Sequence, residues 1–226
     1  MGEDNGFIIY NLLKKRRDIM KKTNNKGFSL VELIIVIAIM AILAGAIAPA
    51  LIKYIDKSRK SNDVTSAKTI KTAVETALGN ESVYELITIG ASKATDGFCY
   101  IDVEPGQPTG SSSGSQTCIN IRQHATTDDV TGGKINGKTI DQLLVVAKDA
   151  IGQNIGEKTP KIKYRKNAKG SNDLPKEFVV AVSKGGTVYV FISTANDNSF
   201  TCSETDGVVE TTKGFQLCPN ICDEYQ

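Results

Sequence analysis

The spacing of apolar residues in this chain changes near residue 52. From Leu33 to Ile52 there is no charged residue, and a helix of that length, at about 1.5 Å per residue, would be about 30 Å long, the thickness of a bilayer core. Beyond Ile52 the apolar residues return at intervals of three and four, as Val64, Ala67, Ile70, Val74, Ala77 and Leu78. This second pattern predicts an amphipathic helix.

The two patterns join without a turn signal, so the sequence predicts one long helix. We expect residues 28–52 to form a transmembrane or packing half and residues 53–79 an amphipathic half, with Gly79-Asn80 as the C-terminal stop. Such a helix would be about 75 Å long. Pro49 removes one backbone hydrogen bond and is expected to kink or soften it.

The remainder, residues 80–226, is expected to form a globular head. Residues 80–138 are expected to be mostly connector, with two short strands at 98–101 and 118–121 on either side of a Gly/Ser-rich tip. Residues 139–152 have the spacing of a helix with Thr139 as N-cap and Gly152 as stop.

The C-terminal third has the alternation of β-strands. Residues 177–182 and 187–192 are separated by Ser-Lys-Gly-Gly, which is a strong signal for a tight hairpin. Residues 161–166, 200–203 and 215–218 are expected to add extended segments. The predicted fold class is therefore α+β, a long N-terminal helix packed against a C-terminal antiparallel sheet.

Charge gives little indication of a partner. The chain has 27 basic and 25 acidic residues, and residues 1–27 hold seven of the basic and three of the acidic ones. The rest is therefore slightly acidic and well mixed, and we predict no nucleic-acid binding. About 147 residues follow residue 79, enough for one compact domain.

Glu32 is the anomaly of the apolar segment. An acidic residue at the centre of a membrane helix costs about 2.5 to 3.5 kcal/mol, so a partner is expected. No Lys, Arg or His lies between Leu33 and Ile52. The nearest cation would be an α-amine created by cleavage after Gly27, about one helical turn before Glu32. On this interpretation Gly27 is a processing site and Glu32 an assembly contact.

Residues 26–37, KGFSLVELIIVI, resemble the prepilin signal of type IV pilins and their relatives in type II secretion and competence systems. The resemblance extends over residues 21–59. It implies that a membrane peptidase cuts between Gly27 and Phe28 and N-methylates Phe28, and that Glu32 neutralises a neighbouring subunit's amine. Pro49 falls where many pilins have a helix-softening proline. Residues 1–27 would then be the leader, with 1–19 a start-site artefact if translation begins at Met20.

The resemblance also implies a function. A pilin is a structural subunit, not an enzyme, and needs no cofactor. It would be a precursor in the bacterial cytoplasmic membrane and then part of an extracellular pilus for adhesion, twitching motility or surface colonisation. Its partners would be copies of itself, other pilins, prepilin peptidase and the inner-membrane assembly platform.

Three alternatives remain open. The chain could be a type II secretion or competence pseudopilin acting in macromolecule transport, or a membrane-anchored binding protein that never polymerises. Alternatively, the apolar segment could be an ordinary secretory signal, with a cleavage site among its small residues near Ala48. The last two leave Glu32 unexplained, and the secretory signal also leaves the Gly27-Phe28 junction unexplained.

The five cysteines suggest disulfides in an exported protein. Cys99 and Cys118 flank the Gly/Ser tip and could staple it. Many pilins close a C-terminal loop with a disulfide, which the resemblance would assign to Cys202 with Cys218 or Cys222, worth about 3 kcal/mol. A zinc site built from the last three and His124 is a weaker alternative, because no CxxC pair exists, and we expect no metal. His124 is expected to be a surface residue.

Overall fold

The computed structural model describes residues 27–109, 118–165, 174–194, 200–205, 208–211 and 213–226. The chain divides into two compact units, residues 1–50 and 51–226. The predicted connector tip at 110–115 and the leader before Gly27 lie outside the described residues.

The long helix is confirmed. Helix α2 extends over Leu30–Leu78 as 49 residues without a break. It continues through Pro49, and the boundary between the two units falls directly after Ala50. The buried residues of α2 all lie in the second unit. They are the predicted stripe without Leu78, which is half-buried, and with Asp63 and Ala73 added: Asp63, Val64, Ala67, Ile70, Ala73, Val74 and Ala77.

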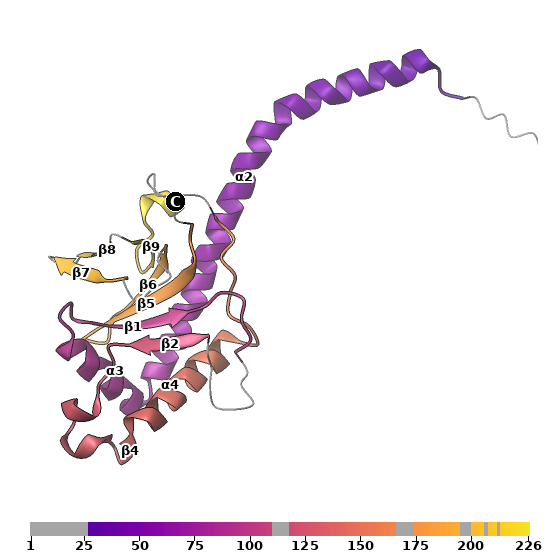
Figure 1. Ribbon diagram of the computed structural model, residues 1–226. Helices are drawn as coiled ribbons and strands as arrows, with labels where there is room; N and C mark the ends of the chain where they lie inside the picture. Colours follow the sequence, from indigo (N-terminus) through magenta and orange to yellow (C-terminus); the bar gives the residue numbers. More distant parts are fainter. Residues whose placement is uncertain (1–26, 110–117, 166–173, 195–199, 206–207, 212) are drawn as a thin grey trace, which may run out of the picture. The chain divides into compact units, whose positions relative to one another are not determined.

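The second unit is built on an antiparallel sheet in the order β2-β1-β5-β6-β9 (Figure 1). Its strands are β1 (Phe98–Val103), β2 (Ile119–Arg122), β5 (Glu177–Ser183), β6 (Val188–Ser193) and β9 (Gly214–Cys218). The predicted hairpins β1–β2 and β5–β6 are both present. Two small ladders accompany the sheet, β3 (Lys134–Ile135) with β4 (Lys138–Thr139), and β7 (Cys202–Thr205) with β8 (Val208–Thr211).

The two faces of the sheet form two separate cores. Along β5, Phe178, Val180 and Val182 belong to an inner core, in which the buried stripe of α2 packs against the sheet. Val179 and Ala181 point to the other face, where an outer core forms with Phe200, Cys202 and Val209 from the segments around β7 and β8. The strand alternation thus supplies both cores from one central sheet.

The segment 80–138 contains more regular structure than its composition suggested. Helix α3 (Glu81–Lys93) begins directly after α2, because Asn80 caps it by accepting hydrogen bonds from the backbone of Ser82 and Val83. Gly90 lets α3 approach the next segment closely, since an added Cβ would lie 2.3 Å from the Gln123 carbonyl oxygen. Short 3₁₀ turns follow at Thr127–Asp129 and Thr131–Gly133.

Helix α4 (Ile140–Ile155) was predicted correctly at its start and incorrectly at its end. Thr139 caps it in a capping box with Gln142. Gly152 is buried inside the helix, and the stop is Gly156, whose φ of +109° lies in the region that favours glycine. A third cluster, between α3 and α4, consists of Leu86, Ala125, Ile135, Ile140 and Leu143. The chain ends in a 3₁₀ turn, η3 (Asp223–Tyr225).

Candidate processing junction and assembly helix

The residues of the predicted cleavage junction precede α2 and are open to solvent. Phe28 is 84% exposed. A Cβ built on Gly27 would have no atom within 4 Å, and its φ is not in the left-handed region. Nothing in the described fold therefore requires glycine at this position. Any requirement for glycine at position 27 would therefore come from another molecule that recognises the junction.

Glu32 has a local role that the sequence reasoning missed. The backbone N–H of Ser29 donates to Oε2 of Glu32 over 2.9 Å. Ser29 stands directly before the first residue of α2, so this contact is the glutamate half of a capping box. The S-x-x-E pattern of residues 29–32 was the signal that could have predicted it. One carboxylate oxygen thus satisfies an end of the helix, which leaves the other for a further partner.

The first unit exposes a continuous apolar surface. No residue of 27–50 is buried, and even the least exposed large side chain of the stretch, Val36, is 47% exposed. In the described part of the chain α2 is the one helix long and apolar enough to cross a membrane. Such a surface is stable only in lipid or against other apolar helices, because contiguous exposed patches of this kind mark membrane or protein contacts. Gly45 has no atom within 4 Å of its Cβ position and so leaves room for a closely packed helix.

The second unit holds its part of α2 with a buried carboxylate. The side chain of Asp63 is fully buried and accepts hydrogen bonds from the backbone N–H groups of Lys163 and Tyr164, each over 2.8 Å. Burial raises the pKa of Asp63, and these two N–H groups oppose the rise. The predicted strand at 161–166 is therefore an extended segment, described to Arg165, whose backbone pairs with a side chain of α2.

The aromatic rings beside Asp63 connect this contact to the end of the chain. The ring of Tyr225 lies 5.5 Å from that of Tyr164 and 5.8 Å from that of Phe215. Lys60 lies over the Tyr164 ring at 5.3 Å, and its ammonium donates to the backbone oxygen of Gln226 over 3.5 Å. The buried Tyr225 hydroxyl has no hydrogen-bond partner among the described atoms.

The register of β1 and β2 does not fit the predicted Cys99–Cys118 disulfide. Val103 pairs with Ile119 and Tyr100 with Arg122, so Cys118 lies beside Glu104, five positions along β1 from Cys99. At about 3.4 Å per residue the cysteines are about 17 Å apart, whereas disulfide-bonded Cα atoms lie within about 7 Å. The Cys99 thiol instead donates to the Arg122 carbonyl.

The C-terminal cysteines are divided between the two cores. Cys202 belongs to the outer core, whereas Cys218 belongs to the inner core and Cys222 packs against it. Cys202 and Cys218 thus belong to cores on opposite faces of the sheet, which disfavours the predicted Cys202–Cys218 bond, whereas a Cys202–Cys222 bond stays a prediction. No disulfide occurs in the described residues, which include all five cysteines. No group of three or more potential metal ligands is found there, and His124 instead contacts the Ala125 carbonyl through Nδ1 over 2.8 Å.

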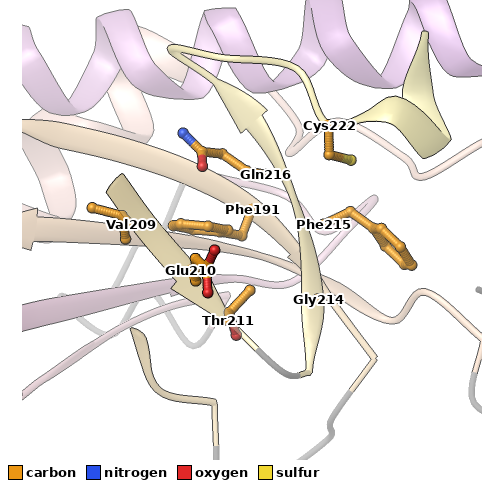
Figure 2. Close-up of a pocket in the computed structure, with 8 residues that line it drawn as sticks. All are labelled: Phe191, Val209, Glu210, Thr211, Gly214, Phe215, Gln216 and Cys222. Atoms are coloured by element: carbon orange, nitrogen blue, oxygen red, sulfur yellow. The ribbon is translucent and has the colours of Figure 1, made fainter. Parts of the chain in front are cut away.

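A surface cavity of about 320 Å³ lies between β8 and β9 (Figure 2). Its lining residues include Phe191, Val209, Glu210 and Thr211 together with Gly214, Phe215 and Gln216 of β9, and the Phe215 ring points away from Phe191. Cys222 reaches it from beyond the end of β9. It contains none of the residues that sequence analysis assigned to processing or assembly.

Comparison with known proteins identifies the class of this chain. A family profile described as the prokaryotic N-terminal methylation motif matches residues 22–48. The chain is 33% identical over 110 residues to a type IV major fimbrial protein FimA of Dichelobacter nodosus, covering 48% of this chain and 68% of that protein. It is 38% identical over 84 residues to a fimbrial protein of Moraxella nonliquefaciens, covering 37% of this chain and 53% of that one. No solved structure matches.

The chain thus has a prepilin-type N-terminus and is related in sequence to fimbrial proteins. The chain belongs to the type IV pilin family.

Proposed function

We propose that this chain is a structural subunit of a type IV pilus that polymerises through residues 28–52 into an extracellular filament for adhesion, motility or surface colonisation. Before assembly the precursor resides in the cytoplasmic membrane. Prepilin peptidase cuts between Gly27 and Phe28 and methylates the new Phe28 amine. The assembly platform then transfers the subunit to other copies and to related pilins.

The observation that carries this proposal is the exposed, charge-free half of α2 with one carboxylate at its beginning. In lipid or among apolar helices, the remaining oxygen of Glu32 has no cation in its own segment. An α-amine at Phe28 of a neighbouring subunit supplies one, and each of the two charges then stabilises the other. N-methylation keeps the amine positively charged, so this attraction persists after modification.

Mass spectrometry of the N-terminal peptide from sheared filaments tests the processing step. The expected peptide begins at N-methyl-Phe28. A peptide that begins at residue 1 or 20, or after Ala48, would contradict the proposed junction and favour a retained leader or a secretory signal.

Substitution of Gly27 separates a demand of the peptidase from a demand of the fold. Because no described atom lies near the Gly27 Cβ position, Gly27→Ala and Gly27→Leu should both fold and insert normally. Cleavage should be slowed slightly by alanine and blocked by leucine, as seen by immunoblot of the precursor and mature forms. Equal cleavage of both variants would show that the peptidase does not require a small residue at position 27.

A further inference from the structure

Basic residues begin immediately after the apolar segment of α2. The first charged residue after Ile52 is Lys53, and it is followed by Lys57, Arg59 and Lys60 within the next two turns. The first three are exposed and Lys60 is half-buried. The intervening Tyr54 is 73% exposed. Tyrosine and flanking lysines at the end of an apolar helix are the residues that settle at the headgroup level of a bilayer.

A second segment, distant in sequence, adds charge at the same place. Asp63 holds the backbone of residues 163–164 against α2. The side chains of Lys163 and Arg165 are exposed and alternate with the half-buried Tyr164, on whose ring Lys60 lies. Two segments a hundred residues apart are thus held together through Asp63, and both carry exposed basic side chains.

The acidic residues in this neighbourhood offset the charge only in part. Asp63 is buried and turns its oxygens to backbone N–H groups. Asp56 lies within the basic stretch, and Asp223 is exposed in the C-terminal turn that contacts Tyr164 through Tyr225. The basic cluster, which we name the collar, consists of Lys53, Lys57, Arg59, Lys60, Lys163 and Arg165.

We propose that the collar binds anionic phospholipid headgroups and thereby seats the head of the unassembled subunit on the membrane surface. The inference rests on the proposed membrane-inserted precursor. Because Lys53 follows the apolar segment without a linker, the near end of the collar emerges at headgroup level wherever that segment spans. Clusters of four to eight basic residues next to a spanning helix attract anionic lipid headgroups electrostatically. Lipid is favoured over a soluble polyanion by this continuity with the spanning segment.

The test is a lysine-acylation footprint of the full chain in two kinds of nanodisc. One contains phosphatidylcholine alone and the other adds phosphatidylglycerol. In the anionic discs acylation of Lys53, Lys57 and Lys163 should slow roughly threefold, and high salt should reverse this. Lys134 and Lys138 are the internal controls. They lie in the β3–β4 ladder, which contacts α3 and α4. Helix α3 begins just after the end of α2 at Leu78, about 22 Å along the helix from Asp63.

Paired variants identify the contribution of the second segment. Lys163→Gln with Arg165→Gln should weaken the protection of Lys57 in anionic discs, and Lys134→Gln with Lys138→Gln should leave it unchanged. These side chains are exposed, so the fold should be retained, which far-UV circular dichroism checks. Unchanged protection of Lys57 in the Lys163→Gln, Arg165→Gln variant would show that the second segment does not contribute, and would overturn the collar as defined above.

Three other outcomes also decide the proposal. Equal acylation in the two discs, with the chain inserted in both, overturns the collar and leaves the pilin assignment intact. Failure to insert in either disc overturns the membrane anchoring and the collar with it. Equal protection by soluble polyphosphate added to neutral discs would show a general polyanion surface and so contradict lipid recognition.

Discussion

The two halves of α2 use their apolar residues in opposite ways. From Leu30 to Ala50 no side chain is buried, although nearly all are apolar. From Asp63 to Ala77 every third or fourth residue is buried against the sheet, although the helix as a whole is polar there. The apolar side chains of the first half can be buried only by another molecule, whereas those of the second half are already buried within their own unit. We therefore expect that substitutions in one half of the helix leave the packing of the other half unchanged.

Each half also contains an acidic residue that accepts a backbone hydrogen bond, and these two residues differ in burial as the two halves do. Glu32 accepts a single N–H from its own helix and is exposed. Asp63 accepts two N–H groups from a distant segment and is fully buried. Removing Glu32 should therefore damage assembly and spare the head, and removing Asp63 should damage the head. The predictions below test whether this separation holds.

The largest effect is expected for Glu32→Ala in filament assembly. Leaving a partner charge unpaired in an apolar core costs about 3 to 5 kcal/mol, which corresponds to a reduction of roughly 100-fold to several thousand-fold in incorporation. Processing after Gly27 and membrane insertion should be retained. The measurement compares processed protein in the membrane with protein in sheared filaments, using the variant as the sole copy.

Glu32→Gln is the matched control, because an amide oxygen can still accept from the Ser29 N–H but has no charge. Loss of filaments in both variants assigns the effect to charge. Normal filaments with glutamine and none with alanine would assign it to helix capping, and normal filaments in both would mean that Glu32 is a tolerated charge.

Asp63→Ala should destabilise the head by about 2 to 4 kcal/mol, because it removes a fully buried acceptor from two part-buried N–H groups. Denaturant unfolding of the full chain in detergent, followed by near-UV circular dichroism, measures this, since the chain has seven tyrosines and no tryptophan. Glu75→Ala is the control on the same helix. It removes an exposed ion pair with Lys71 and should cost about 0.5 kcal/mol or less. Similar losses in the two variants would refute the importance of the buried contact.

Sequence predicted the elements whose signal is local. The charge-free segment, the three-four spacing after it and the Gly-Gly turn between β5 and β6 each lie within a few residues, and each was confirmed. Helix α3 was missed although Val83, Leu86, Ile87 and Ala91 have helical spacing. Gly79-Asn80 was taken only as a stop, whereas Asn80 also begins the next helix.

Features that depend on long-range placement could not be predicted. That Asp63 is buried rather than on the polar face depends on a segment a hundred residues later. The positions of Cys99 and Cys118 beside the Gly/Ser tip suggested a staple, but strand register, which sequence spacing does not fix, separates them. At the candidate site, Gly27, Phe28 and Glu32 were recognised from one contiguous motif, and their proposed roles await the experiments above.

Glycines extend the comparison to the backbone. Gly90→Ala should destabilise the head by about 1 to 3 kcal/mol, because its Cβ would meet the backbone of Gln123 and His124 rather than a movable side chain. Gly45→Ala meets nothing and should leave head unfolding unchanged. Normal folding of Gly90→Ala would contradict the close approach of α3 to residues 123–124, and a normal filament yield with Gly45→Ala would contradict close helix packing at Gly45. The same unfolding and fractionation assays report both.

The smallest expected effect is the pH dependence of the Asp63 contact. Burial raises the pKa of Asp63 in the folded state above its value of 3.8 in the unfolded chain. The folded state therefore binds the proton more tightly, so this group's stabilisation is fully present below pH 3.8 and is lost as pH rises through the raised value. Other carboxylates contribute to the total, so the quantity to measure is the difference in unfolding free energy between the wild type and Asp63→Asn. That difference should shift in favour of the wild type as pH falls from neutral. A shift in the opposite direction would mean that the N–H groups of Lys163 and Tyr164 outweigh burial, and that Asp63 is held as a fully stabilised carboxylate.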